Sequence, residues 1–271
     1  MKIFAIRDAT DEAGKDLAYL LYYEIGKKFY IELPEDADIW DTPLLLDTFI
    51  KKGEHSVNSY WSKIWVQQRI VPPDRQNIAE ILRDNGLKEY DEYALLMIAF
   101  GRCEQDDYYL SAIDESSLPN SVTERFGRKI EDVAALANNC LLIFFRDGTM
   151  RKCDLTEYFE KEPRFEVLQR NPEWFAMVGI QTGGYGLRWD DNLTIPNTVL
   201  YNMGVSVPLS ADDFRAFVAN RIINGAEAAE MLNCSRQYIN ELVKTGKLHP
   251  VKSSEKNTLF MKSEILQRLW T

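Results

Sequence analysis

Residues 225–251 read GAEAAEMLNCSRQYINELVKTGKLHPV, and this stretch has the clearest structural pattern of the carboxyl-terminal part of the chain. Its apolar spacing predicts a short helix over 226–232 and a second helix over 236–245. Ser235 stands where an N-cap is favoured, and Gly246 stands where helices commonly end. The stretch therefore predicts two capped helices joined by a tight turn.

The second of these helices has one apolar and one polar side. At about 100° per residue, its apolar side carries Tyr238, Ile239, Leu242 and Val243. Its polar side carries Arg236, Gln237, Asn240, Glu241 and Lys244. Small residues on the first helix, Ala228 and Ala229, allow the close crossing that a helix-turn-helix requires.

The flanking segments complete a winged module. Residues 248–261, LHPVKSSEKNTLFM, place two apolar runs around the polar tip 252–257, as a hairpin wing does. Ser263 is expected to cap a final helix that closes the core with Ile265, Leu266, Leu269 and Trp270. On the other side, Ser210 is expected to cap a connector helix with an apolar stripe of Phe214, Phe217 and Val218.

This arrangement resembles the excisionase and MerR-like winged helix-turn-helix group. The matching residues are Ala228, Ala229, Leu232, Ser235, Ile239, Leu242, Gly246 and Leu248. The resemblance implies that the partner is double-stranded DNA and that the start of the second helix enters the major groove. It places Ser235, Arg236, Gln237 and Asn240 against bases or phosphates, and Lys244, Lys252, Ser253, Ser254 and Lys256 against the backbone.

Charge separates this tail from the rest of the chain. The whole chain has 32 basic and 42 acidic residues, whereas the segment from Arg221 to Thr271 has eight basic and five acidic residues. A DNA-binding module on an acidic body gives such a contrast. The alternative is a docking module that has lost DNA binding, because Glu241 lies on the expected DNA face and the positive charge is small.

The middle region, residues 119–207, is expected to form a small α+β domain. Its pattern predicts strands over 132–137, 141–145, 150–155, 175–181 and 186–189, with helical pieces at 155–159 and 165–169. The segments LLIFFRDGTMRKCDLTEYF, FEVLQRNPEWFAMV and GLRWDDNLTIPNTVLY resemble the bacterial family known as domain of unknown function 2442. Such domains are often encoded with a helix-turn-helix. Two features depart from the family pattern, a Glu-rich segment over 155–165 and Asp190 after Trp189. The resemblance therefore does not establish a ligand surface shared with the family.

The amino-terminal region, residues 1–118, is expected to form an α/β domain. A strand over 2–7 and a hairpin turning at Gly26 precede four stretches with helical spacing, at 43–50, 60–70, 75–85 and 91–101. The text WSKIWVQQRIVPPDRQNIAEIL, followed by QDDYYL, is faintly similar to the segment preceding the kinase part of HipA-like toxin proteins. None of the kinase residues follows it. Aromatic residues at helical spacing more often form core.

The sequence offers little to catalysis. The chain has two histidines, His55 and His249, and neither stands in a metal-binding or nucleophile pattern. The glycines around Tyr185 lack the spacing of a phosphate loop and predict a turn, and the acidic residues near Asp106 predict a solvated loop. We therefore expect no enzyme activity, no catalytic residues, no metal site and no cofactor. Scattered cysteines and the absence of a long apolar run favour a cytoplasmic protein with no membrane contact.

Taken together, these patterns predict an α+β multidomain protein divided at 1–118, 119–207 and 208–271. The expected function is DNA binding, as a bacterial or phage transcriptional regulator. The alternative is a non-catalytic interaction adaptor, for example one related to toxin–antitoxin systems or phage defence, with the tail as a docking module. An uncharacterised enzyme with acidic residues in the middle domain is a further rival. The sequence does not decide whether the chain forms a homodimer or binds a protein partner through the amino-terminal and middle domains.

Overall fold

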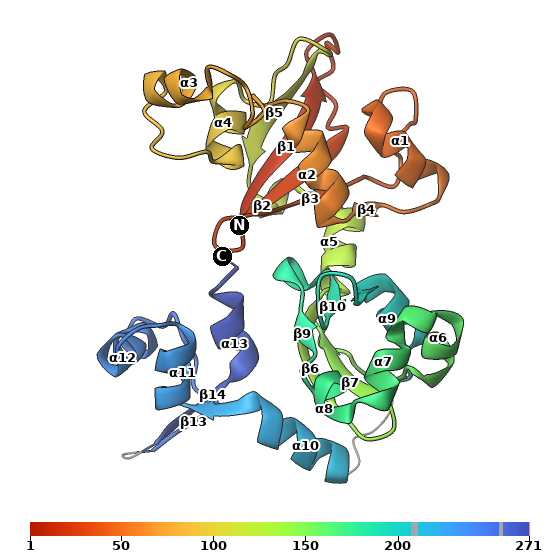
Figure 1. Cartoon of the computed structure of the whole chain (residues 1–271), viewed down its shortest axis with the longest axis vertical. Coiled ribbons are helices and arrows are strands. Elements are labelled where there is room, and N and C mark those ends of the chain that lie inside the picture. Colours follow the sequence, from red (N-terminus) through yellow and green to blue (C-terminus); the bar gives the residue numbers. More distant parts are fainter. Residues whose placement is uncertain (207–210, 255–256, 271) are drawn as a thin grey trace. The chain divides into compact units, whose positions relative to one another are not determined.

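The computed structural model of the chain describes residues 1–206, 211–254 and 257–270, apart from the side chains of residues 211, 212 and 214. The chain forms two compact units, residues 1–124 and 125–271. Both units combine helices with antiparallel sheets, so the chain is a multidomain α+β protein (Figure 1). The three-way division at 118 and 207 stays a prediction from the sequence.

The first unit is built around a five-stranded antiparallel sheet of order β4-β3-β2-β1-β5. Its strands are β1 (Lys2–Asp8), β2 (Ala18–Tyr23), β3 (Lys28–Glu32), β4 (Ser56–Val57) and β5 (Tyr108–Ile113). Its helices are α1 (Leu44–Lys51), α2 (Ser59–Gln67), α3 (Ile78–Asp84) and α4 (Glu92–Ile98). The expected first strand, hairpin and four helices are therefore all present. Strand β5 was not predicted.

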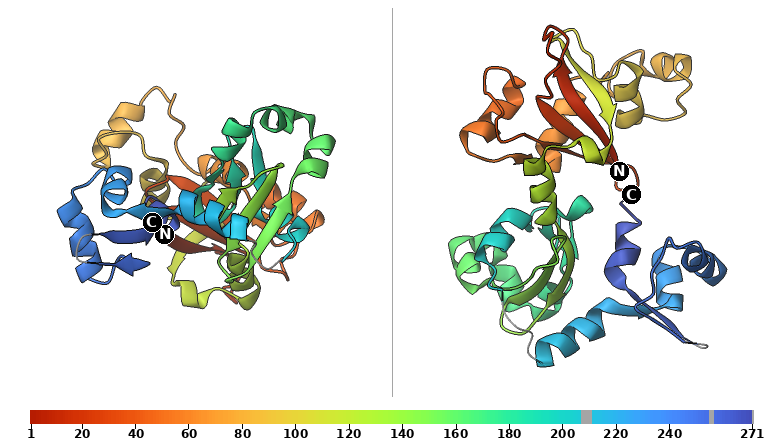
Figure 2. Two further views of the ribbon diagram at one scale, coloured as in Figure 1. Left: turned by 90° about the horizontal axis from the view of Figure 1, so that it is seen from below. Right: turned by 180° about the vertical axis from the view of Figure 1, so that it is seen from behind.

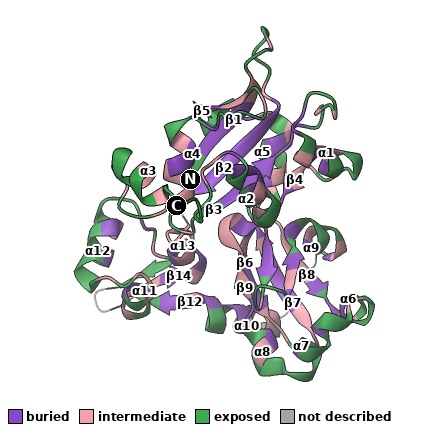
Figure 3. Ribbon diagram, turned by 45° about the horizontal axis from the view of Figure 1, so that its top comes forward, coloured by how far each residue is buried: buried purple, intermediate pink, exposed green. Residues whose placement is uncertain are grey.

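Burial explains why the first sheet forms where it does. Every residue of β2 is buried, and Figure 3 shows the sheet as the least exposed part of this unit. Trp65 of α2 and Leu96 of α4 are each 1% exposed and pack with Ile31 of β3 in one core. Burying large apolar side chains from both layers is the main stabilising term for such a fold.

The second unit begins with a helix, α5 (Asn120–Gly127), that spans the boundary between the units. A three-stranded antiparallel sheet follows, formed by β6 (Ile130–Ala135), β7 (Cys140–Phe145) and β8 (Met150–Asp154). A second small sheet contains β9 (Gly179–Ile180), β10 (Gly186–Arg188) and β11 (Thr194–Pro196). Four helices accompany them, α6 (Thr156–Lys161), α7 (Glu166–Arg170), α8 (Pro172–Ala176) and α9 (Asn197–Met203).

The strand predicted over 175–181 is wrong in its first half. Phe175 lies in α8, and only Gly179 and Ile180 form strand β9. The reason is local: the side chain of Asn171 accepts a hydrogen bond from the Trp174 N–H, and Pro172 occupies the first turn. A capping side chain followed by proline starts a helix, which divides the apolar run.

The turn around Tyr185 needs glycine at one position. Gly184 has φ +77°, and a Cβ added there would lie 2.5 Å from the Ile130 carbonyl oxygen. We expect Gly184→Ala to lower the free energy of unfolding, measured by urea denaturation, by about 1–3 kcal/mol from the backbone strain alone. Gly148→Ala is the matched control, since Gly148 has φ +80° and no atom within 4 Å of the added Cβ. Equal losses in the two variants would contradict a steric contribution at Gly184.

The tail of the second unit contains four helices and a third sheet. Helix α10 (Ala211–Arg221) runs directly into β12 (Ile222–Asn224), as Figure 2 shows from two sides. Helices α11 (Gly225–Met231) and α12 (Arg236–Lys244) follow, and then β13 (Lys252–Ser253), β14 (Thr258–Met261) and α13 (Lys262–Gln267). The strands pair in the order β12-β14-β13, so the wing is a hairpin extended by the strand that precedes α11.

Candidate nucleic-acid interface

Helix α11 is fixed at its start by reciprocal capping. The Asn224 side chain accepts hydrogen bonds from the N–H groups of Ala226 and Glu227, and the Glu227 carboxylate accepts one from the Asn224 N–H. This capping box satisfies donors that the first helical turn leaves free. Ala228 and Ala229 are 0% and 6% exposed, so the small side chains face the second helix as predicted.

Helix α12 crosses α11 with its apolar side inward. Asn233 has φ +48° in the turn between the helices, and Ser235 caps α12 by accepting a hydrogen bond from the Tyr238 N–H at 3.2 Å. Ile239 and Leu242 are 1% and 4% exposed and join Ala228 in the core. The predicted helix boundaries are confirmed within one residue.

One residue of the predicted apolar side is misplaced. Tyr238 is 48% exposed, whereas it was expected in the core with Ile239 and Leu242. Its position lies at the edge of the apolar arc, where a large ring reaches solvent. The core of this module is accordingly smaller than the sequence pattern indicates, and Tyr238 adds an aromatic side chain to the exposed surface.

The polar side of α12 is open to solvent. Ser235, Arg236, Gln237, Asn240 and Lys244 are all exposed, and most of α12 has the colour of exposed residues in Figure 3. Within the described part of the chain, the side chains of Arg236, Gln237, Asn240 and Lys244 form no hydrogen bond or ion pair. These four side chains can therefore reach a ligand without breaking an internal contact. Glu241 is exposed on the same side, as predicted, and is the one acidic residue of this helix.

The wing carries fewer free groups than predicted. Lys252 and Ser253 are exposed on β13, but Ser254 shapes the turn, since its hydroxyl donates to the Asn257 carbonyl at 2.9 Å. The Asn257 N–H donates back to the Ser254 hydroxyl at 3.1 Å. Ser254 is thus held in the turn. Lys256, also predicted to contact the DNA backbone, lies outside the described residues.

The final helix starts differently from the prediction. Met261, without a side-chain cap, precedes α13, and Ser263 is buried inside the helix. Ser263 instead hydrogen-bonds the carboxylate of Asp132, on β6 of the middle region. Ile265 is completely buried and closes the core as expected, whereas Leu266, Leu269 and Trp270 are half-buried. The predicted cap at Ser210 lies outside the described residues.

Helix α10 joins the winged module to the second face of the β6-β7-β8 sheet. The rings of Phe217 and Phe144 lie 4.7 Å apart, within an apolar cluster that also contains Leu142. At the end of α10, the Arg221 Nε lies 3.0 Å from the Asp132 Oδ1, and both side chains are at least nine-tenths buried. These contacts hold the connector helix on the middle domain.

Burial dominates the electrostatics of this contact. It raises the pKa of Asp132 to about 6, although the Arg221 charge and the hydrogen bonds from Val133 and Ser263 act in the opposite direction. Burial also lowers the pKa of Arg221. Arg221 was counted with the basic residues of the tail, but it is paired and cannot contact DNA. The sequence did contain a signal for this contact. The continuous apolar run of β7 indicates a strand whose sheet is covered on both faces.

Two family models match the second unit. Residues 224–271 match the model described as helix-turn-helix domain. Residues 130–204 match the model described as protein of unknown function, DUF2442. The resemblances of the tail and the middle region are therefore confirmed, and the helix-turn-helix match of the tail suggests DNA binding. The HipA-like resemblance of the first unit is not shown. No curated protein and no solved structure matches the chain significantly.

Neither a membrane-spanning helix nor a metal-binding cluster is found among the described residues. They contain no helix that is long and apolar enough to cross a membrane. They also contain no cluster of three or more histidine, cysteine, aspartate or glutamate side chains that could hold a metal ion. In the loop predicted to be solvated, Asp106 is bound to Arg69, with the Nη2 and Oδ2 atoms 2.6 Å apart.

Proposed function

We propose that the protein is a non-enzymatic DNA-binding regulator of transcription that acts through its helix-turn-helix domain. The single observation that supports this most is the exposed polar side of α12, where Arg236, Gln237 and Asn240 have no partner among the described residues. Recognition helices present such a side to the major groove, with residues near the helix start contacting base edges. The buried side of α12, on Ala228 and Ala229, makes this presentation rigid.

The geometry suggests separate roles for these groups. Arg236, at the first position of α12, is placed to bind a guanine or a phosphate, and Asn240, one turn later, is placed to pair with an adenine edge. Lys244 at the helix end and Lys252 in the wing supply phosphate contacts. Specificity in this proposal depends on α12, and the wing adds sequence-independent affinity.

We further propose that strong binding needs two copies of the chain. Few cations face the DNA in one copy, and Glu241 stands among them. The chain carries a formal net charge of −10, which repels DNA. A single domain with a few phosphate contacts binds weakly at physiological salt. Two linked domains bind more tightly, because the first contact raises the effective concentration of the second domain at the DNA. Sedimentation of the protein on its DNA, giving one copy per high-affinity site, would contradict this step.

The roles of α12 and the wing are separable by experiment. Sites are first selected from a random DNA pool with the full chain, and binding is then measured by fluorescence anisotropy at several salt concentrations. Asn240→Ala and Arg236→Ala should each cost about 1–3 kcal/mol on the selected site and relax base preference. Lys252→Ala should weaken all sequences alike and reduce the salt slope by about one unit.

Two controls make the outcome decisive. Glu230→Ala changes an exposed residue of α11 and should leave binding to the selected site unchanged. Circular dichroism of each variant checks that the domain stays folded. If Arg236→Ala and Asn240→Ala bind as the unmodified chain does, α12 does not read DNA. The alternative adaptor function, with the tail as a docking module, would then be favoured, and the exposed Glu241 is consistent with it.

A further inference from the structure

The first unit contains a cleft that the proposed DNA binding does not use. It has a volume of about 920 Å³ and lies between α1, α2 and the loop before β5. Aromatic side chains form much of its wall, namely Phe49, Trp61, Trp65 and Tyr108. The other wall residues include eight polar or charged ones, and a volume in this range is typical of ligand sites.

The floor of the cleft is rigid. The Arg69 guanidinium lies 4.0 Å from the centre of the Trp65 ring and is 2.6 Å from the Asp106 carboxylate. These side chains therefore hold each other in place.

The edge of the cleft exposes large apolar side chains. Leu44 and Trp61, both in the wall, are 85% and 38% exposed. Trp40 is 87% exposed in the turn that leads to α1, and Tyr60 is 67% exposed beside the Trp61 ring. Exposed tryptophan and tyrosine beside a pocket are typical of the energetic centres of protein interfaces.

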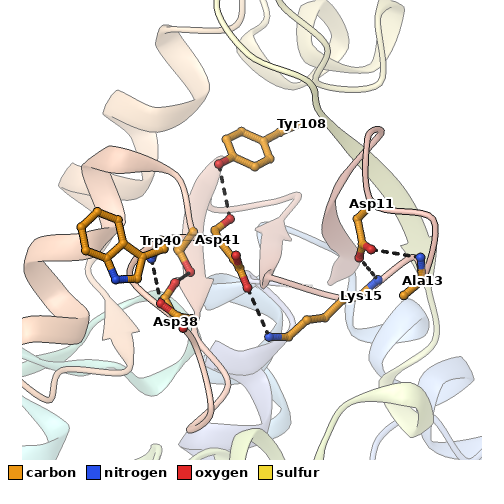
Figure 4. A network of polar contacts seen from close by, with 8 residues as sticks. Asp11, Ala13, Lys15, Asp38, Trp40, Asp41 and Tyr108 are labelled. Carbon is orange, nitrogen blue, oxygen red and sulfur yellow. Dashed lines mark hydrogen bonds and ion pairs between the residues drawn. The ribbon is translucent and has the colours of Figure 1, made fainter.

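Hydrogen bonds fix the loops that carry this edge (Figure 4). The Trp40 N–H donates to the Asp38 carboxylate at 2.9 Å, and the Tyr108 hydroxyl donates to the Asp41 carbonyl at 3.3 Å. The second bond joins the turn before α1 to the start of β5. The backbone of the turn that carries Trp40 is therefore held before any partner binds, which lowers the entropic cost of binding.

Charge indicates the chemistry of the occupant. The two loops joined by Tyr108 carry one exposed basic residue, Arg102, and six exposed acidic residues, Glu35, Asp36, Asp38, Asp41, Glu104 and Asp107. Lys15 lies 3.7 Å from Asp41, and within the wall Lys52 is balanced by Glu54. The edge therefore keeps an excess of negative charge, which favours a positively charged partner and disfavours an acidic one.

We propose that this cleft binds a segment of another protein that has an aromatic or large aliphatic anchor residue flanked by Lys or Arg. The anchor enters between Trp61 and Trp65, and the flanking cations lie along the acidic loops. This site is independent of the helix-turn-helix domain, so its success or failure leaves DNA binding unaffected.

Selection of a random peptide library on the full-length protein tests the proposal. We expect the enriched peptides to combine a Trp, Phe or Leu anchor with neighbouring Lys or Arg. Trp61→Ala should weaken an enriched peptide about tenfold or more, as truncation of an interface tryptophan does. The double variant Glu104→Gln/Asp107→Asn should weaken it several-fold at low salt and by little at high salt.

A matched control is available in the same unit. Ile98 of α4 is 48% exposed and lies outside the cleft wall, so Ile98→Ala should bind the peptide normally. Circular dichroism and urea denaturation of each variant report whether the first unit stays folded, since DNA binding tests only the second unit. Enrichment of acidic peptides, or of none, would overturn the proposal, as would peptides that bind Trp61→Ala as tightly as the unmodified chain. A cleft that takes neutral aromatic small molecules but no peptide would also overturn it.

Discussion

Asp132→Ala is expected to destabilise the second unit by about 3–5 kcal/mol, because it leaves a buried cation without its partner. Arg221 is enclosed at the end of α10, where its Nε atom lies 3.0 Å from the Asp132 carboxylate. Ser263, at the start of α13, loses its hydrogen bond to the same carboxylate. One substitution thus removes the polar contact that connects β6 with two helices of the tail.

Hydrogen exchange monitored by mass spectrometry localises this effect in the full chain. The amides of β6 and α10 should lose protection in Asp132→Ala, and urea denaturation gives the free energy. The double variant Asp132→Leu/Arg221→Met should recover most of the loss, since an apolar pair of similar size replaces the two buried charges. Lys161→Ala is the control, because both side chains of the Lys161–Glu157 pair are exposed and exposed pairs contribute less than about 1 kcal/mol. An unchanged midpoint in Asp132→Ala would contradict the role of the ion pair.

The pH dependence of this effect has a defined sign. Burial raises the pKa of Asp132 from 3.8 in the unfolded chain to about 6 in the folded one. Between these values the folded protein binds more protons than the unfolded protein, so the contribution of Asp132 to stability is fully present below pH 4 and falls as the pH rises to about 6. The loss caused by Asp132→Ala should therefore be smaller at pH 7 than at pH 4.

The structure departs from the sequence-based predictions mostly where contacts are distant along the chain. The hairpin of β2 and β3 and the capped helices of the tail were predictable, because turn and cap residues act locally. Strand β5 was not predicted, since its partner is β1, and Ile113 pairs with Ile3. The same holds for Asp132 and Arg221, which lie far apart in the sequence.

Residues at the proposed DNA face differ in how well the sequence predicted them. The exposure of Arg236 and Asn240 follows from helical periodicity alone. The role of Ser254 in its turn depends on the Asn257 backbone, and the exposure of Tyr238 does not follow from its place on the predicted apolar side. The cleft of the first unit was also beyond prediction, because Trp65 and Tyr108 meet only after the sheet has formed.

The second large effect is expected at the crossing of α11 and α12. Ile239 is 1% exposed and packs among Ala228, Leu242 and Ile265. Ile239→Ala should lower the free energy of unfolding by about 2–5 kcal/mol, from lost transfer energy and the cavity that remains. The matched helix-turn-helix segment spans only residues 224–271, and a domain of this size has a small margin of stability. The substitution should consequently unfold most of the tail at 37 °C.

Tyr238→Ala distinguishes this loss of structure from a loss of surface contacts. Tyr238 neighbours Ile239 in the same helix but is 48% exposed, so its truncation should change stability by less than about 1 kcal/mol. Circular dichroism and DNA binding of both full-length variants are measured across a temperature series. Ile239→Ala should lose helical signal and DNA affinity together and regain both on cooling, whereas Tyr238→Ala should keep its fold throughout. If Ile239→Ala lost its helix signal while keeping full affinity for DNA, binding would have to reside outside the helix-turn-helix domain, and the proposed recognition by α12 would be wrong.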